Sequence, residues 1–258
     1  MPSVFPGPRI KVERAYRHIS ELEAELRQFR ERKPYHVFIE HDASAGMNHI
    51  CYEVRETIPA SWGAIIGDAI HNLRSALDLL VNDLVAMHGV VKRGHARFPI
   101  FADDAAWTSS IKRIKGVSPA VQDTLQRLQP YKTGNRSLRD MHEIDIADKH
   151  QLLVPAVTAA AVRDISARMA SGGQMAIGEM KLDRAETGIH RQGSSWPSEW
   201  HMEGNDKFNV SIDILFGDID TLPRTPVLPS LNRLAKAVAS VIDGFEPQPI
   251  SSPAQITI

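Results

Sequence analysis

The segment from Pro59 to His88 constrains the fold most strongly, because its apolar residues recur at intervals of three and four over its whole length. That spacing places them on one side of an α-helix, and Gly89 follows as a natural stop. The apolar side is formed by Ile66, Ile70, Leu73, Leu77, Leu80, Val81 and Leu84. Any fold of this chain must therefore bury one face of a long amphipathic helix.

Other segments of the N-terminal half have equally clear patterns. Apolar residues from Val12 to Phe29 predict a helix that ends before Pro34, and the β-rich runs around Gly46 predict a hairpin at about 35–57. Asp103 or Asp104 and the pair Ser118–Pro119 are typical of the starts of two short helices, and Ser137 is the predicted cap of a helix that ends near His150.

The pattern changes after Leu152. Val/Ile-rich runs broken by Gly and Pro predict an antiparallel sheet as far as Asp220, with a loop around Trp196 and Trp200, and Ser230 to Phe245 predicts a last helix. The expected fold is α+β: a mainly helical N-terminal bundle with a β-hairpin insert, followed by an antiparallel sheet and a C-terminal helix. We expect a helical region over 1–151 and a β-rich region over 152–258, either separate or sharing one core.

Composition excludes several classes of protein. The chain has 258 residues, of which 43% are hydrophobic and 24% charged, with a formal net charge of −1, close to the globular norm. It has no apolar run of the ~20 residues that a membrane span requires, and its start lacks the apolar region of a signal peptide. The single cysteine, Cys51, cannot form an internal disulfide and is predicted to be a core or edge residue. We therefore expect a cytoplasmic protein without a membrane partner.

The helix predicted over 59–88 also carries an unusual polar face. Water-facing helices usually present Lys and Glu, whereas this face has Asp, His, Asn and Ser, which are weak helix formers. Its residues, spread over about 120° opposite the apolar side, are Asp68, His71, Asn72, Ser75, Asp78 and Asn82. We expect this face to be buried against a second helix or to line a cleft; the alternative is an exposed face.

The helix predicted from Ser137 to His150 is the natural partner of that face. His142, Asp145 and Lys149 lie on one line of it, whereas Asp148 and His150 are rotated away from that line. These residues either complete an inter-helix site or form only an intrahelical ladder, whose pairs contribute about 0.2–0.5 kcal/mol each.

Three chemical interpretations remain open. Asp68 with His71 and His142 with Asp145 could supply two pairs of metal ligands from facing helices, although such sites mainly use Glu. Alternatively, a histidine oriented by an aspartate transfers protons while an arginine or lysine holds an anion. The third interpretation is a structural network that fixes the packing of two helices. The chain has no P-loop, dinucleotide-binding glycine loop, G-x-S-x-G elbow, H-E-x-x-H motif or cysteine pair for zinc.

Several segments also resemble a family of uncharacterised bacterial and phage proteins: GDAIHNLRSALDLL, RFPIF, LQPY and the DKH of the later helix. In those relatives the first segment tends to read RSALDH, and an R-x4-H on a helix is similar to the signature of HEPN domains. The resemblance implies a helical domain that binds or cleaves RNA, often as a dimer, and a link to phage defence. Arg74 matches that signature, but Leu79 stands where the histidine is expected, which weighs against RNase activity at this motif.

The leading hypothesis is a site that binds or hydrolyses a phosphate-containing or other anionic ligand. His71 is the predicted proton-transfer residue, Asp68 or Asp78 orients it, and Arg74 or Lys149 holds the anion. The predicted catalytic set is His71, Asp68, Asp78, His142 and Asp145, and the predicted ligand-binding set is Asn72, Arg74, Asp148, Lys149 and His150. The alternatives are a HEPN-like RNA-binding or degenerate RNase domain and a structural or assembly protein. We assign no metal and no specific cofactor, and expect a small anionic ligand or RNA as partner and a homodimer through the stripe from Val12 to Phe29.

Overall fold

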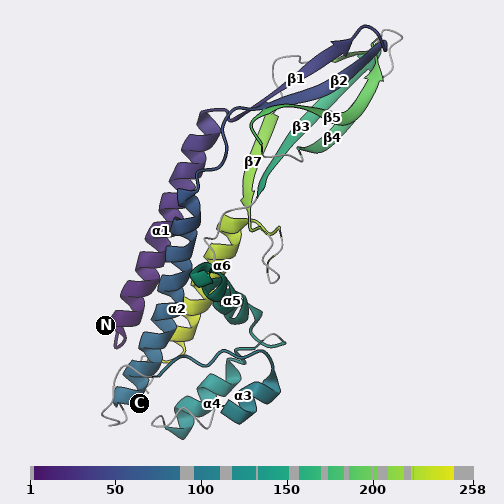
Figure 1. The fold of residues 1–258 in the computed structure, drawn as a ribbon. Helices are drawn as coiled ribbons and strands as arrows, with labels where there is room; N and C mark the ends of the chain where they lie inside the picture. The colour runs from purple at the N-terminus through teal and green to yellow at the C-terminus, as the bar shows by residue number, and fades with distance from the viewer. Residues whose placement is uncertain are drawn as a thin grey trace, which may run out of the picture. The chain divides into compact units, whose positions relative to one another are not determined.

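The computed structural model describes the chain except residues 1–2, 88–95, 111–117, 132, 151–156, 170–173, 183–185, 199, 203–208, 218–221, 223 and 247–258. The described residues form helices and antiparallel strands, with helices at the N-terminal side, antiparallel sheet structure after them and a C-terminal helix (Figure 1). The α+β class predicted from the sequence is confirmed.

The chain divides into two compact units that are each assembled from separate stretches. The first unit contains residues 1–17, 68–146 and 232–258, and the second contains residues 18–67 and 147–231. Several helices therefore contribute residues to both units. The domain boundary expected between residues 151 and 152 stays a prediction.

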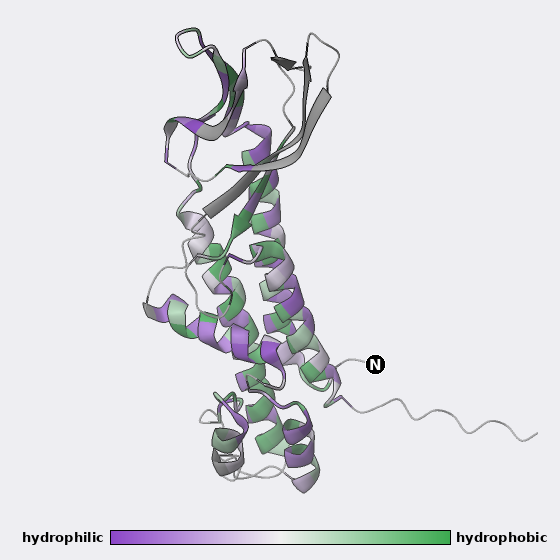
Figure 2. Cartoon of the chain, turned by 90° about the vertical axis from the view of Figure 1, so that its right-hand side faces the viewer, coloured by the Kyte–Doolittle hydropathy of each residue, from purple (hydrophilic) through white to green (hydrophobic). Residues whose placement is uncertain are grey.

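The two long N-terminal helices follow from their apolar spacing. Helix α1 spans Pro6–Glu31 and α2 spans Ser61–Met87, and all seven apolar residues of the stripe predicted on α2 are buried. Figure 2 shows apolar and polar residues alternating along these helices. The remaining helices are α3 (Asp104–Ser110), α4 (Pro119–Arg127), α5 (Arg136–His150) and α6 (Val227–Asp243).

Capping residues set the starts of the shorter helices. Asp103 accepts a hydrogen bond from the amide of Ala106 at 2.8 Å, and Ser118 accepts one from Val121 at 3.3 Å, as their types predict. For α5 the predicted cap was wrong. Asn135 accepts from the amide of Leu138 at 3.4 Å, whereas Ser137 lies inside the first turn. Asn is as favourable a cap as Ser, so residue type alone could not decide between them.

The strands form two antiparallel sheets within the second unit. One has the order β1 (Tyr35–Asp42), β2 (Met47–Val54), β5 (Gly188–Pro197), so the predicted hairpin is confirmed and extended by a later strand. In the other, β3 (Val157–Met169) pairs with β4 (Gln174–Leu182), β6 (Trp200–Met202) and β7 (Asn209–Leu215). The loop expected around Trp196 and Trp200 is instead strand β5 and strand β6. Their backbone partners are distant in sequence, so the local Gly/Ser/Pro composition could not reveal them.

Candidate functional site

A histidine and an aspartate from two helices meet in the first unit. The Nδ1 atom of His71 on α2 lies 3.3 Å from Oδ1 of Asp145 on α5. The His71 side chain is 56% exposed, whereas that of Asp145 is only 3% exposed. Helical spacing places His71 on the polar face of α2. It places Asp145 on the line that it shares with His142 and Lys149 on α5.

This pair fixes the protonation pattern of the imidazole ring. An ionised carboxylate only accepts hydrogen bonds, so Nδ1 of His71 carries the proton and the lone pair of a neutral ring is on Nε2. No described residue forms a hydrogen bond with Nε2. A solvent-facing ring nitrogen backed by a buried carboxylate can accept a proton from a ligand or a water molecule and return it.

The orienting carboxylate differs from the one predicted. Asp145 contacts His71, whereas the expected candidates Asp68 and Asp78 do not have that role. Asp68 is exposed, and its backbone carbonyl accepts a hydrogen bond from Asn72 at 2.7 Å. Asp78 pairs instead with Arg74 at 3.0 Å. The prediction considered neighbours one or two turns away on the same helix, while packing of α5 against α2 supplied a third carboxylate.

Arg74 belongs to a buried network. Its side chain is 7% exposed, and its Nη2 atom donates to the carbonyl of Phe98 at 3.0 Å as well as contacting Asp78. Burial lowers the pKa of Arg74, while the carboxylates of Asp78 and Asp145 raise it and Arg97 lowers it further. The expected role of Arg74 in holding an anion stays a prediction; in the structure its charge faces the carboxylates of Asp78 and Asp145.

The next polar residues of α2 complete this network. Asp78 accepts a hydrogen bond from the amide of Phe98 at 2.8 Å, and Asn82 donates to the carbonyl of Ala96 at 2.8 Å. Together with Arg74, they bind the backbone of residues 96–98 by three hydrogen bonds. One side of the polar face thus holds another part of the chain, as the structural interpretation proposed.

The other predicted residues occupy different surroundings. Asn72 is buried and accepts a hydrogen bond from Nζ of Lys11 on α1 at 3.1 Å. His142 is half-buried on α5. In the second unit, Lys149 is exposed and Asp148 lies against Gly67, where an added Cβ would be 2.5 Å from both carboxylate oxygens. The side chain of His150 lies outside the described residues.

Sequence reasoning missed Lys11 and Arg97. Lys11 had no distinctive pattern in an amphipathic helix of mixed charge. Arg97 is the first residue of the RFPIF segment, which was used only for the resemblance to a family of uncharacterised proteins. Its position beside Arg74 depends on contacts between residues that are far apart along the chain, so no local signal could identify it.

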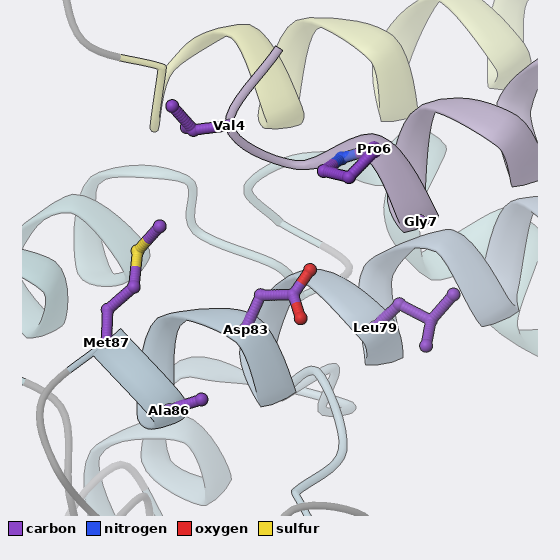
Figure 3. A pocket seen from close by; sticks show the side chains of 7 residues that line it. All are labelled: Val4, Pro6, Gly7, Leu79, Asp83, Ala86 and Met87. Carbon is purple, nitrogen blue, oxygen red and sulfur yellow. The ribbon is translucent and has the colours of Figure 1, made fainter.

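A separate pocket lies elsewhere in the first unit, between the start of α1 and the end of α2. It has a volume of about 520 Å³ and is lined by Val4, Pro6, Gly7, Leu79, Asp83, Ala86 and Met87 (Figure 3). Leu79, which occupies the histidine position of the R-x4-H signature, lines this pocket and is 37% exposed. The lining is mainly apolar and carries one carboxylate, so it lacks a group of proton-transfer character comparable with His71.

The described residues hold neither a cluster of metal ligands nor an activated thiol. None of their His, Cys, Asp and Glu side chains gather in threes or more in a way that could hold a metal ion. Cys51 is buried on β2, where its thiol donates to Glu40 at 3.5 Å. Burial, followed by this hydrogen bond, raises the pKa of Cys51, which disfavours the nucleophilic thiolate.

Within the described ranges, no helix combines the length and hydrophobicity needed to cross a membrane. No protein-family model, curated protein or solved structure matches the chain. The resemblance seen in segments such as Gly67–Leu80 therefore stays a prediction. The chemistry that the site can perform follows from the His71–Asp145 pair.

Proposed function

We propose that the chain binds and hydrolyses a phosphate-containing ligand, with His71 as the proton-transfer residue and Asp145 as the residue that orients it. One observation carries this proposal: an exposed imidazole donates to a buried carboxylate and keeps Nε2 open to solvent. Such a dyad holds the ring in one tautomer and stabilises the imidazolium that forms when Nε2 accepts a proton.

The reaction class follows from what this pair can do. Nε2 of His71 accepts a proton from water as the water oxygen forms a bond to phosphorus, and the ester P–O bond breaks. The leaving alkoxide takes a proton from solvent, and the imidazolium then releases its proton to restore the neutral ring. General base catalysis of this kind contributes typically about 10²–10⁴-fold to a rate.

Nearby cations support an anionic ligand. Lys11 binds Asn72, the residue that follows His71, and Arg97 lies close enough to Arg74 to lower the pKa of its guanidinium. Positive side chains in the same unit as a proton-transfer group favour phosphate, whose negative charge they attract.

A structural role is the second candidate, and it is favoured for one part of the polar face. Arg74, Asp78 and Asn82 hold residues 96–98, so that part of the face stabilises the fold. No comparable observation favours RNA cleavage through an R-x4-H motif, because Arg74 is buried and Leu79 lacks a proton-transfer group.

The proposal is tested by hydrolysis of bis-p-nitrophenyl phosphate and of a single-stranded RNA oligonucleotide. We expect His71→Ala to lower the rate at least 10²-fold on the substrate that the wild-type protein cleaves. Asp145→Asn should lower it as well, because an amide at this position can donate to Nδ1 and favour the tautomer that carries its proton on Nε2. His36→Ala is the matched control, since the side chain of His36 is exposed on β1 and forms no hydrogen bond with a described residue.

A second measurement separates catalysis from folding. The ¹⁵N chemical shifts of the His71 ring should report the Nδ1–H tautomer in the wild-type protein, and circular dichroism should show His71→Ala folded as the wild type is. A failure of the wild-type protein to cleave either substrate, or equal rates for wild type and His71→Ala, would contradict the proposed function.

A further inference from the structure

Hydrogen bonds hold the segment of residues 96–101 against α2, both before and after Arg97. Asn82 binds the carbonyl of Ala96, while Asp78 and Arg74 bind the amide and the carbonyl of Phe98. Further along, the amide of Phe101 donates to the carbonyl of Pro130 at 3.0 Å. The backbone that carries Arg97 is therefore fixed by hydrogen bonds immediately before and after it.

The side chain of Arg97 contrasts with its fixed backbone. Phe98, Pro99 and Ile100 are buried, whereas Arg97 is exposed. Arg97 forms no hydrogen bond or ion pair with any residue that the structure describes. Nη1 of the neighbouring Arg74 is also buried without a hydrogen-bond partner among the described residues. Two guanidinium groups thus lie near each other with donor capacity that this part of the protein does not use.

The spacing along α2 places this segment within reach of the histidine. His71 and Asp78 are seven residues apart, which puts them on the same face and separates them by about 10 Å along the helix axis. Because Asp78 binds the residue directly after Arg97, the backbone of Arg97 lies about two helical turns from His71 along α2.

We propose that Arg97 binds a phosphate group of the ligand on which His71 acts, an inference that rests on the function proposed above. Arg74, Asp78 and Asn82 are then positioning residues that hold the backbone of this binding residue. A guanidinium forms two parallel hydrogen bonds with a phosphate, and a fixed backbone reduces the entropy lost on binding. The ligand class is a phosphate chain, either the backbone of a single-stranded nucleic acid or a small polyphosphate.

Binding of two probes tests this assignment: inorganic pyrophosphate and a ten-residue oligouridylate. We expect Arg97→Gln to weaken binding of at least one probe about tenfold, as loss of a hydrogen bond to a charged group predicts. For the oligouridylate, the slope of log Kobs against log[salt] should also fall by about 0.7, the value for one phosphate contact on a single strand. Arg27→Gln is the matched control, because Arg27 is exposed on α1 and its replacement removes the same charge.

The positioning role is tested by a double-mutant cycle. Asn82→Ala should weaken binding several-fold in the wild-type background and have little further effect in the Arg97→Gln background, because both act on one contact. Additive effects would show that Asn82 acts only on general stability and would overturn the positioning role. If Arg97→Gln weakens binding of pyrophosphate alone, the ligand is a small polyphosphate. If it weakens binding of the oligouridylate, the ligand is a nucleic acid.

Failure of this inference is distinguishable from failure of the proposed function. Equal affinities and salt slopes for Arg97→Gln and Arg27→Gln would overturn the role of Arg97, whatever the rate of His71→Ala. If Arg97→Gln weakens binding while His71→Ala leaves the rate unchanged, the phosphate contact stands and the proton-transfer role of His71 fails.

Discussion

Replacement of Arg74 by methionine tests whether the charge of Arg74 stabilises the fold or binds a ligand. Methionine keeps an unbranched apolar stem but removes the guanidinium that contacts Phe98 and Asp78. The buried carbonyl of Phe98 then loses a charged donor, and the buried carboxylate of Asp145 loses a compensating charge.

The expected cost can be worked from these contacts. Removing one partner of a buried ion pair costs about 3–5 kcal/mol, and a hydrogen bond to a charged group is worth about 1.5–3 kcal/mol. The Asp78 side chain is 31% exposed, so water can partly replace Arg74 there, which favours the lower end of the range. We expect Arg74→Met to lower the free energy of unfolding by about 3 kcal/mol, or Tm by roughly 6–12 °C for a chain of this size.

Urea unfolding followed by circular dichroism measures this loss, and Arg17→Met is the matched control. Arg17 forms the same i, i+4 type of ion pair with Glu13 at 2.6 Å, but both side chains are more than 60% exposed. An exposed pair of this kind contributes at most about 1 kcal/mol. If Arg74→Met is as stable as Arg17→Met but loses affinity for phosphate, Arg74 is a ligand-binding residue as the sequence suggested, and the structural argument is refuted.

Two further predictions concern other parts of the chain. Gly67→Ala should lower the free energy of unfolding by about 1–3 kcal/mol, because the added Cβ meets the carboxylate of Asp148. Urea unfolding should show that Asp148→Ala relieves part of this loss, and Gly7→Ala, whose Cβ would lie 3.8 Å from Leu79, should be nearly neutral. The hydrogen bond from Ser3, followed by those from Val4 and Arg9, lowers the pKa of Glu246. The carboxylate of Glu246 therefore stabilises the fold above its unfolded pKa, and this contribution is lost as pH falls through the lower folded pKa. Urea unfolding should therefore show wild type more stable than Glu246→Gln at pH 6, with a difference that shrinks as the pH falls through the folded pKa, and a constant difference would contradict this.

The local periodicity of the chain predicted most of its helices. The stripe on α2 is buried as expected, because a helix places residues three and four apart on one face whatever its neighbours are. The pairing of β5 with β2 could not be predicted, since Cys51 and Arg191 become partners only when strands far apart in sequence align. The choice between Asn135 and Ser137 as the cap of α5 failed for a different reason, because both residue types are suitable.

Most residues of the candidate site, except Lys11 and Arg97, were predictable from the sequence, but their pairing was not. The polar composition of α2 singled out His71, Arg74 and Asp78 as residues that require partners. Which partner each obtained depends on how α5 and the segment Ala96–Phe101 pack against α2. Sequence spacing therefore located the histidine, while the contact of Asp145 and the position of Arg97 depend on tertiary packing.

The hydrogen bonds of Asn82 and Asp78 to residues 96 and 98 also have a consequence for amide hydrogen exchange. The amide of Phe98 donates to the side chain of Asp78, and the side chain of Phe98 is buried, so this amide should exchange with solvent only when the contact with α2 opens. Its exchange rate therefore reports how often this segment leaves the helix, which provides a site-specific probe of the backbone that carries Arg97.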